Sequence, residues 1–310
     1  MKVLVTGAAG YIGSVLVGRL LANGWSVTAL DSLIYRQTSL LQYCADPRFA
    51  FVRGDARDER VVKECLRGAD AVIPLAAIVG APACARDPRL ATSTNLDAIA
   101  MLDALRSRAQ ALIFPTTNSG YGTTSGKEFC TEESPLAPIS LYGRDKVEAE
   151  RRLLDRGNAV TLRFATVFGV SPRMRLDLLV NDLTLRALRD RFLVIFEKGF
   201  KRNFLHILDA ADCFLFCIDR FDSLNGKPYN VGCNEANISK EELALAIKKR
   251  IPDLYIHFAE VGSDPDKRNY VVSNERINRE GFTASRGLDE GIGQLILAYG
   301  MIGRSGMYNC

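Results

Sequence analysis

A tyrosine and a lysine four residues apart are the first side chains in this sequence whose spacing suggests chemistry. Tyr142 and Lys146 lie at the start of an expected helix, where this spacing places both on one face. A phenol, with a pKa of ~10, is a poor base at neutral pH, but a neighbouring cation favours the phenolate and lowers that pKa. The pair could therefore remove a proton from a hydroxyl group. The alternative is an ordinary amphipathic helix, because this spacing often arises by chance.

A polar loop before that helix supplies further candidates. Residues 114–122 follow an apolar run and read Phe-Pro-Thr-Thr-Asn-Ser-Gly-Tyr-Gly, so we expect them at the end of a strand. Thr117 could bond both the reacting hydroxyl and the tyrosine oxygen. Asn118 and Ser119 could contact the molecule that carries this hydroxyl.

The N-terminal stretch has the pattern of a dinucleotide-binding unit. An apolar run opens the chain, and Gly7, Gly10 and Gly13 follow it before a helical pattern begins. Glycines at this spacing suit, in order, a tight turn, a close backbone approach to a pyrophosphate, and close packing of a helix on a strand. Tyr11 and Ile12 complete this part of the predicted cofactor site.

An acidic residue ends the next apolar run. Asp31 stands where a carboxylate bonds an adenosine ribose. Its charge would repel a 2′-phosphate and so favours NAD, although Arg36 follows five residues later. With NAD bound, the nicotinamide would accept a hydride while Tyr142 removes the hydroxyl proton. A glycine-rich turn without a ligand is the alternative, and it leaves Asp31 unexplained.

Strand and helix patterns alternate along the first half of the chain. The expected strands after the first are 25–30, 49–53, 71–75, 111–114 and 159–164, and the main helices are 59–67, 88–106 and 142–156. This alternation predicts an α/β fold with a doubly wound parallel Rossmann sheet of six strands and helices on both faces.

Polar or small residues follow several strand ends, where an open parallel sheet places its ligand. Asp55 could bond the adenine amino group, or it could cap the next helix. Asn95, inside the long helix, either forms a buried link to the active-site loop or is solvated. Small residues let a ribose or nicotinamide lie close to the backbone. The cofactor site therefore also includes Ala56, Leu75, Ala76 and Ala77.

Strand and helix patterns no longer alternate regularly beyond residue 169. An irregular stretch leads into a helix at 177–189, and a strand at 193–196 and helices at 239–250 and 289–299 follow. We expect an NAD-binding Rossmann domain over 1–169 and a smaller C-terminal α/β substrate-binding lobe over 170–310. Parts of roughly 203–235 are expected to return to the Rossmann core.

Composition excludes several classes of function. The 310 residues carry 40 basic and 36 acidic side chains, spread along the chain with a net charge of +4, which gives nucleic-acid binding little support. No apolar stretch approaches the ~18 residues of a membrane span, so we expect a soluble, cytoplasmic protein. The 8 cysteines and 2 histidines offer no credible zinc site, and no metal is expected. Cys213 and Cys217 are expected to pack as small hydrophobic side chains.

These ordered motifs resemble the extended short-chain dehydrogenase/reductase superfamily, and within it the sugar-nucleotide epimerases and dehydratases. The resemblance covers essentially the whole chain and includes the stretches 202–209 and 229–232. It implies that Tyr142 is the general base and that Lys146 holds the nicotinamide ribose and lowers the tyrosine pKa. It also implies that Thr117 orients the sugar.

The resemblance extends to the substrate side. It implies that Arg202 and Arg268 contact the substrate pyrophosphate, because a guanidinium group can donate two hydrogen bonds to one phosphate. A surface salt bridge is the alternative for each. Arg173 and Arg175 are assigned to the nucleotide as well.

Departures from the family pattern narrow the reaction. The 4,6-dehydratases follow the threonine with an Asp-Glu pair, whereas this chain has Asn118 and Ser119, which cannot do that acid-base work. The 3,5-epimerases need an acid-base pair built on cysteine, and we set them aside, since only Cys84 and Cys130 lie near in sequence. The remaining reaction is oxidation of the sugar at C4. It either ends at the 4-keto sugar or continues with return of the hydride to C4, which gives the 4-epimer.

A narrower group shares several stretches with this chain. Residues 116–122, 173–182 and 264–268 are similar to bacterial dehydrogenases that oxidise C4 of GDP-linked manno-heptose on the way to modified capsular heptoses. The similarity makes GDP the favoured nucleotide over UDP. An NAD-binding sensor without turnover is the remote alternative, disfavoured because tyrosine, lysine and threonine are all present.

A homodimer is expected by analogy. The helices near 88–106 and 142–156 would form a four-helix interface. Alanines at 91, 98, 100 and 104 would permit close approach there, or they could pack on the sheet instead.

Overall fold

The computed structural model describes residues 1–125, 128–260 and 268–302. These residues form two compact units. Unit 1 comprises Met1–Gly120, Pro138–Arg163 and Ala211–Tyr229, and unit 2 comprises Tyr121–Ala137, Phe164–Ala210 and the described residues from Asn230 onward. Both units are assembled from several chain segments. The predicted motif at 264–267 and Cys310 lie outside the described residues.

Unit 1 is built on a seven-stranded sheet. Its strands are β1 (Lys2–Thr6), β2 (Ser26–Asp31), β3 (Phe49–Arg53), β4 (Ala71–Pro74), β5 (Ala111–Thr117), β7 (Ala159–Phe164) and β11 (Pro228–Val231). They run in the order β11-β7-β5-β4-β1-β2-β3, and β1 pairs in parallel with both β2 and β4. The predicted doubly wound parallel sheet is confirmed. The prediction of six strands is wrong, because β11 is a short run with a buried asparagine and has no strand signal of its own.

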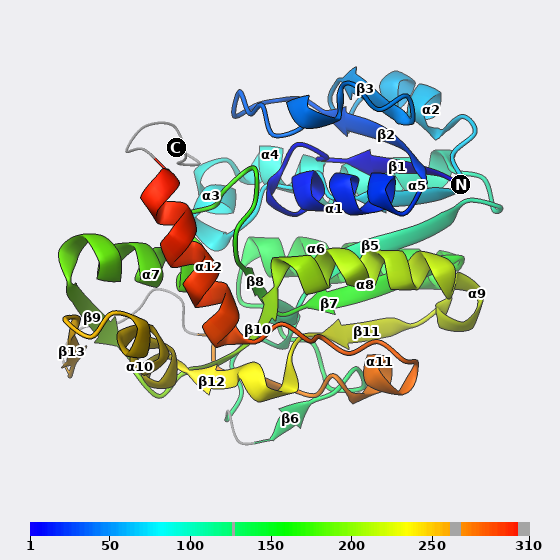
Figure 1. Cartoon of the computed structure of the whole chain (residues 1–310). Helices are drawn as coiled ribbons and strands as arrows, with labels where there is room; N and C mark the ends of the chain where they lie inside the picture. The colour runs from blue at the N-terminus through cyan, green and yellow to red at the C-terminus, as the bar shows by residue number, and fades with distance from the viewer. Residues whose placement is uncertain (126–127, 261–267, 303–310) are drawn as a thin grey trace. The chain divides into compact units, whose positions relative to one another are not determined.

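Helices cover both faces of this sheet (Figure 1). They are α1 (Tyr11–Ala22), α2 (Glu59–Leu66), α3 (Ala81–Arg86), α4 (Pro88–Thr92), α5 (Ala98–Leu105), α6 (Leu141–Arg156), α8 (Ile207–Asp219) and α9 (Phe221–Leu224). On one face α1 and α8 are joined where Arg19 Nε donates to Asp212 Oδ1 at 2.8 Å. On the other face α2, α5 and α6 pack on the sheet through buried side chains such as Leu102, Leu112 and Leu153.

The long helix predicted over 88–106 is interrupted. A π-helical segment (Ser93–Asp97) separates α4 from α5, and such segments often occur at functional sites. Ala91 and Ala98 are buried inside unit 1, whereas Ala104 is exposed. The two buried alanines therefore pack within the unit, and the homodimer stays a prediction.

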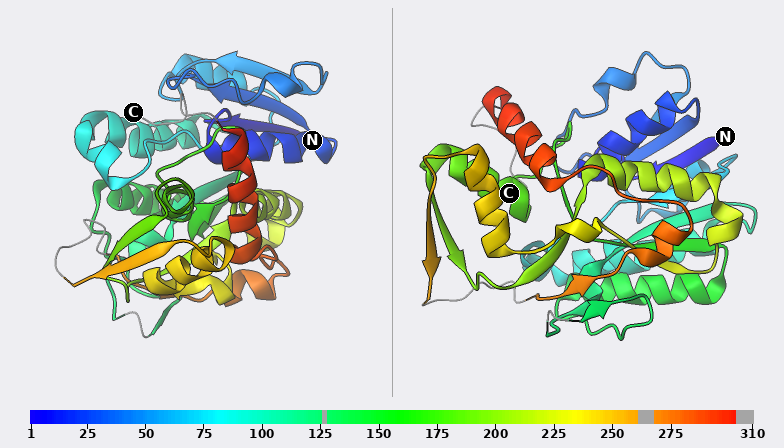
Figure 2. Two further views of the ribbon diagram at one scale, coloured as in Figure 1. Left: turned by 60° about the vertical axis from the view of Figure 1, so that its left-hand side comes forward. Right: turned by 60° about the horizontal axis from the view of Figure 1, so that its bottom comes forward.

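Unit 2 contains three small sheets and a cluster of helices (Figure 2). Its strands are β6 (Phe129–Cys130), β8 (Thr166–Phe168), β9 (Phe192–Phe196), β10 (Lys201–His206), β12 (Asn237–Ser239), β13 (Tyr255–Ala259) and β14 (Val271–Val272). Its helices are α7 (Leu179–Asp190), α10 (Lys240–Arg250), α11 (Glu275–Arg279) and α12 (Leu288–Met301). A second hydrophobic core joins α7, α10 and α12 to Phe168 and Phe204 of the three-stranded sheet.

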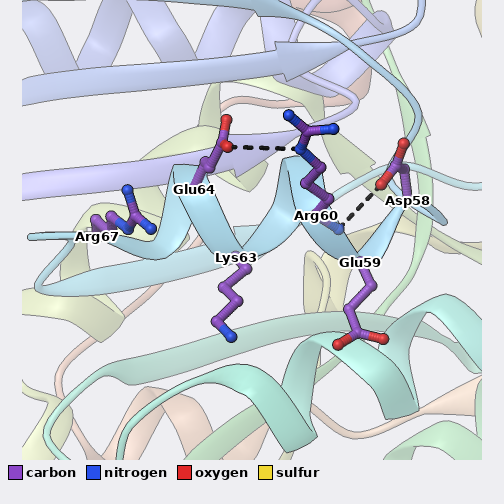
Figure 3. Close-up of a pocket in the computed structure, with 6 residues that line it drawn as sticks. All are labelled: Asp58, Glu59, Arg60, Lys63, Glu64 and Arg67. Atoms are coloured by element: carbon purple, nitrogen blue, oxygen red, sulfur yellow. Dashed lines mark hydrogen bonds and ion pairs between the residues drawn. The ribbon is translucent and has the colours of Figure 1, made fainter.

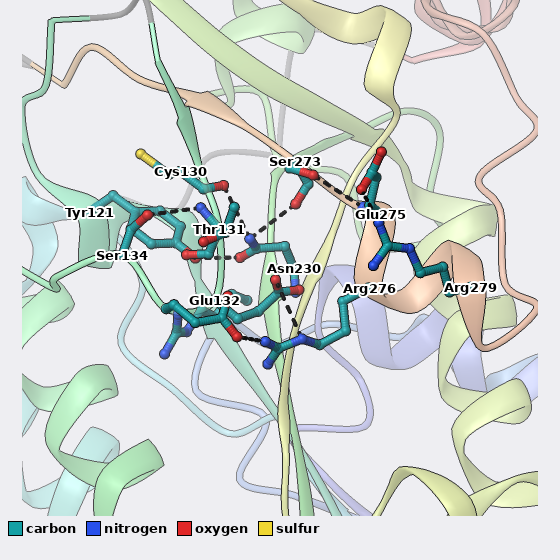
Figure 4. Close-up of polar contacts among 12 residues, drawn as sticks. Tyr121, Cys130, Thr131, Glu132, Ser134, Asn230, Ser273, Glu275, Arg276 and Arg279 are labelled. Carbon is teal, nitrogen blue, oxygen red and sulfur yellow. Dashed lines mark hydrogen bonds and ion pairs between the residues drawn. The ribbon is translucent and has the colours of Figure 1, made fainter.

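A buried polar cluster explains why the segment 121–137 belongs to unit 2 (Figure 4). Asn230 is its centre: Tyr121 donates to the amide oxygen at 2.6 Å, and the amide nitrogen donates to Ser273 O at 3.1 Å. The Asn230 backbone N–H donates to Glu132 at 2.7 Å, and Arg276 lies 3.7 Å from the same carboxylate. Segments far apart in the sequence are thus held by one network.

Within the part of the chain that the structure describes, no helix is both long and apolar enough to span a membrane. The same residues contain no cluster of three or more His, Cys, Asp or Glu side chains that could hold a metal ion. None of the seven cysteines among them forms a disulfide, and Cys213 and Cys217 are buried in α8, as expected from their apolar surroundings.

Candidate active site

The glycine loop is the segment 7–13 between β1 and α1. Its backbone packs closely against the residues that follow β4. Gly7 has a φ of +64°, and a Cβ there would lie 2.5 Å from Ala76 N. A Cβ on Gly13 would lie 2.5 Å from Gly7 O, so the third glycine brings α1 onto the loop. A Cβ on Gly10 would lie 3.0 Å from Gly7 O. A Cβ at any of the three glycines would therefore crowd the loop backbone, which a pyrophosphate must approach closely.

Replacing Gly7 by alanine is expected to destabilise the fold by about 3 kcal/mol, because a positive φ and a backbone clash act together. Gly68→Ala is the matched control, since Gly68 has a φ of +70° but nothing within 4 Å of its Cβ position. Gly68→Ala should cost only about 1 kcal/mol. Urea unfolding of both variants measures the difference, and equal losses would contradict the close contact with Ala76.

Asp31 is held in a fixed orientation at the end of β2. Its side chain is buried, and Oδ2 accepts a hydrogen bond from Ala9 N at 2.9 Å. Oδ1 accepts from Leu33 N at 2.8 Å and from Gln37 Nε2 at 3.2 Å. The carboxylate is thus anchored to the glycine loop and to the turn that follows β2. Gln37 was not foreseen, because a glutamine in a loop carries no recognisable signal.

Asp55 does not cap the helix that follows it. The N-cap of α2 is Asp58, whose Oδ1 accepts from Arg60 N at 2.9 Å, so that alternative is wrong. Asp55 instead pairs with Arg57, whose Nη2 donates to Oδ2 at 2.6 Å and whose hydrogen bonds lower the pKa of the Asp55 carboxyl. Ala56 lies half-buried between the two.

Asn95 is buried and attached to the loop after β4, which excludes the solvated alternative. Its Oδ1 accepts from Ile78 N at 2.9 Å, and its Nδ2 donates to Ile78 O at 3.0 Å. The π-helical segment thereby fixes the backbone just beyond Leu75, Ala76 and Ala77, which are all half-buried.

The predicted base lies in the first turn of α6. Ser140 caps this helix by accepting from Gly143 N at 3.1 Å, and Tyr142 is half-buried. A Cβ on Gly143 would lie 3.6 Å from Ser119 O, so the start of α6 packs closely on the loop after β5. Thr117, the last residue of β5, directly precedes this loop and is also half-buried. The structure therefore brings the elements that carry Tyr142 and Thr117 together.

Lys146 is enclosed one turn further along α6. Its Nζ donates to Pro115 O at 3.1 Å and lies 4.3 Å from the centre of the Phe114 ring. An ammonium group has three N–H donors, and Pro115 O is its one acceptor among the residues that the structure describes. Burial lowers the pKa of Lys146 from 10.5 to about 7. A nearby phenolate would favour the ammonium, so tyrosine and lysine would titrate as a coupled pair.

The two polar residues after Thr117 are buried within the protein. Ser119 N donates to Thr117 Oγ1 at 3.1 Å, and Thr117 Oγ1 lies 3.0 Å from Ser119 Oγ. Asn118 is 1% exposed, and neither polar atom of its side chain has a hydrogen-bond partner among the described residues. The Asn118 amide is enclosed by protein, and its contact with a substrate stays a prediction.

The four arginines assigned to the substrate all lie in unit 2. Arg202 is buried in β10, where it donates to Lys201 O at 3.0 Å and lies over the ring of Tyr270. Arg175 pairs with Asp177 at 2.6 Å. Arg173 Nη1 donates to Met174 O at 2.7 Å, and Arg268 is half-buried.

The cysteines nearest to the site in sequence are poor proton carriers. Cys84 and Cys130 are buried, and burial raises the pKa of both thiols. Cys84 donates to Ile78 O at 3.3 Å, so it supports the loop that Asn95 holds.

The residues of unit 1 fit NAD. Gly7, Gly10 and Gly13 leave the loop backbone without Cβ atoms at these positions, the Asp31 carboxylate is fixed at the end of β2, and the buried Lys146 ammonium keeps two donors for further acceptors. The hollow along α2 in Figure 3 is a different feature. It is lined by the charged side chains of Asp58, Glu59, Arg60, Lys63, Glu64 and Arg67, none of which is a predicted site residue.

Comparisons with known proteins show the family to which the chain is similar. The model of the NAD dependent epimerase/dehydratase family matches residues 3–232. A protein of Bacillus subtilis described as an uncharacterized UDP-glucose epimerase is 31% identical over 264 residues, covering 80% of this chain and 79% of that protein.

Solved structures give the same result. The NAD complex of UDP-glucose 4-epimerase from Thermus thermophilus is 25% identical, with a TM-score of 0.82 over 96% of this chain and 99% of its own. UDP-glucuronic acid 4-epimerase from Bacillus cereus shares the fold, with a TM-score of 0.86 over 97% of this chain and 99% of its own at 24% identity. The glycine loop, the anchored Asp31 and the Tyr142–Lys146 helix are thus features of a chain that belongs to the NAD-dependent epimerase/dehydratase family.

Proposed function

We propose that this enzyme oxidises C4 of a nucleotide-linked sugar and that Tyr142 removes the proton of the C4 hydroxyl. The observation that supports it most is the enclosed Lys146 ammonium, which lies one helical turn after Tyr142 and is bonded to the end of β5. Burying a cation against a carbonyl and an aromatic ring destabilises the folded chain. A role in stabilising the phenolate of Tyr142 would explain why the cation is kept there.

The chain's own groups divide the work of proton transfer. Thr117 orients the sugar hydroxyl, and Tyr142 accepts its proton. Lys146 stabilises the phenolate and donates to the nicotinamide ribose. Bound NAD supplies the acceptor for the C4 hydride. The tyrosine and the threonine are half-buried and so can be reached by a substrate, whereas the lysine is enclosed.

The cofactor is assigned to unit 1. Gly7, Gly10 and Gly13 would border the pyrophosphate, with Tyr11 and Ile12 at the start of α1. Asp31 would accept from the adenosine ribose and Asp55 from the adenine amino group. The backbone from Leu75 to Ala77, held by Asn95, would border the ribose and nicotinamide, with Ala56 near the adenine.

The favoured substrate is a GDP-linked manno-heptose or a related hexose. Thr117, Asn118 and Ser119 are assigned to the sugar, as in the narrower group that the sequence resembles. The arginines Arg173, Arg175, Arg202 and Arg268 are assigned to the nucleotide phosphates, since guanidinium groups bind phosphate in a bidentate manner. Arg202 is already fixed by its contacts with Lys201 and Tyr270, so it could bind phosphate at a small entropic cost.

A sugar-nucleotide 4-epimerase is the second candidate. It is favoured by the Bacillus subtilis relative and by the Thermus thermophilus structure, whose descriptions name UDP-glucose epimerases. In that case the hydride returns to the opposite face of C4, and the sugar carries UDP instead of GDP. A non-catalytic NAD-binding sensor is the third reading, and any turnover would exclude it.

A panel of GDP- and UDP-sugars, including GDP-manno-heptose, tests these candidates. The purified protein is incubated with each sugar and NAD, NADH is followed by absorbance, and products are identified by NMR. NADH and a 4-keto sugar formed from a GDP-sugar would support the C4 dehydrogenase. A C4 epimer formed without net NADH would establish the epimerase. Absence of turnover with every sugar would contradict both.

A further inference from the structure

A buried ion pair begins one turn of α6 beyond Lys146, next to the residues assigned to catalysis. Glu150 of α6 and Arg163 of β7 are 3% and 5% exposed. Arg163 donates to Glu150 Oε1 from Nε at 3.0 Å and from Nη2 at 2.7 Å. The other carboxylate oxygen, Oε2, accepts from Thr116 Oγ1 at 2.9 Å. Because Thr116 precedes Thr117 in β5, this network ties β5, α6 and β7 together at the predicted site.

Stability alone does not account for this ion pair. Removing two charges from water costs more than burying apolar side chains of similar size, and the rest of this face of α6 packs through Ala149 and Leu153. Its place on the helix is more informative. Tyr142, Lys146 and Glu150 follow one another at intervals of four, so they occupy the same face of α6 on successive turns.

We propose that Glu150 is a positioning residue: held by Thr116 and Arg163, it fixes α6 against β5 so that Tyr142 and Thr117 face the same substrate hydroxyl. This inference rests on the proposed function, which assigns the proton transfer to Tyr142.

Two adjacent residues of β5 carry the attachment. Lys146 donates to the carbonyl of Pro115, and Glu150 accepts from the side chain of Thr116, so two successive turns of α6 are bonded to the strand. Proton transfer requires the phenol oxygen within hydrogen-bond reach of the hydroxyl, and a displacement of ~1 Å can cost about 10²-fold in rate. A rigid attachment at this point therefore acts on the chemical step.

Thr116→Val is the sharpest test, because it removes only the hydrogen bonds of the Thr116 hydroxyl, to Glu150 Oε2 at 2.9 Å and to Leu162 O at 3.4 Å, and preserves both the side-chain shape and the ion pair. Substituting Glu150 itself would leave the Arg163 charge buried without a partner and could unfold the chain. Thr116→Ser keeps the hydroxyl and serves as the rescue. Thr161→Val in β7 is the matched control, since Thr161 is fully buried and its Oγ1 has no hydrogen-bond partner among the described residues.

Steady-state kinetics with the substrate found in the sugar panel gives the first readout. We expect Thr116→Val to lower kcat about 10-fold with KM unchanged, and Thr116→Ser to restore most of it. Thr161→Val should match the wild type. A kcat of Thr116→Val equal to that of Thr161→Val would overturn the proposal, even if thermal stability fell.

Phenol titration gives a second readout that does not depend on turnover. The absorbance change with pH is compared between each variant and the same variant carrying Tyr142→Phe, which isolates the Tyr142 phenol. We expect the midpoint of the Tyr142 phenol titration to shift in Thr116→Val and to remain unchanged in Thr161→Val. Wild-type turnover that survives Tyr142→Phe, or no turnover at all, would overturn the proposed function. An unmoved Tyr142 titration in Thr116→Val would then overturn the positioning role separately.

Discussion

Replacing Tyr142 by phenylalanine is expected to lower kcat by about 10³-fold and to leave NAD affinity unchanged. The substitution removes only the phenol oxygen, so the ring still packs at the start of α6, while the C4 hydroxyl loses its base. Turnover is measured with the sugar that the wild type accepts, and NAD binding is measured by calorimetry on the same preparations. Loss of turnover together with loss of NAD binding would instead indicate a damaged cofactor site.

The matched control is Tyr255→Phe, which removes the same atom from an exposed residue of β13 in unit 2. Its kcat should equal that of the wild type. Retention of full activity by Tyr142→Phe would contradict the assignment of the base and would leave the buried Lys146 without a chemical explanation.

Replacing Lys146 by methionine is expected to abolish most activity, by about 10²-fold or more, and yet to stabilise the fold. Burial lowers the pKa of this lysine from 10.5 to about 7, so the folded chain holds a cation at an energetic cost. Methionine keeps the length and apolar character of the side chain and removes that cost. After allowing for the lost hydrogen bond to Pro115 O, we expect a gain on the order of 2 kcal/mol at pH 7 in the free energy of unfolding.

The sign of the pH dependence follows from the depressed pKa of Lys146. Between about pH 7 and pH 10.5 the unfolded chain keeps the lysine proton that the folded chain has lost, so the free energy of unfolding of the wild type rises with pH. The advantage of Lys146→Met should therefore be complete below pH 7 and shrink toward pH 10.5. Urea unfolding of both proteins at neutral and alkaline pH measures this difference.

Lys240→Met is the control for burial of a lysine. Lys240 is also buried, but it donates to Phe196 O at 3.2 Å and lies 4.0 Å from the Glu197 carboxylate. Removing it breaks an ion pair, so this variant should be less stable than the wild type. A Lys146→Met protein that is also less stable at pH 7 would contradict the cost assigned to the buried ammonium.

The dinucleotide unit could be predicted because its signals are local. A positive φ at Gly7, close packing at Gly13 and a carboxylate at the end of the next strand each depend on neighbours within one strand–loop–helix unit. The Tyr142–Lys146 face was predictable for the same reason, since a spacing of four fixes two side chains on one side of any α-helix.

Elements that depend on distant partners could not be predicted in the same way. The strand β11 forms because a short run finds an open edge of the sheet beside β7, and the π-helical segment forms where Asn95 reaches Ile78. Asp55 was considered as the N-cap of α2, whereas the structure has Asp58 there, and residue type alone does not separate two aspartates so close to the helix start.

The sequence by itself determined the candidates for the chemistry: the glycine loop, Asp31, Tyr142 and Lys146 are predicted from residue type and short spacing alone. Only the tertiary structure decided how those groups are tuned. Burial against Phe114 lowers the pKa of Lys146, and the Thr116–Glu150–Arg163 network joins α6 to two strands. Both depend on dehydration and on partners up to 34 residues apart in the chain, which no local spacing can specify.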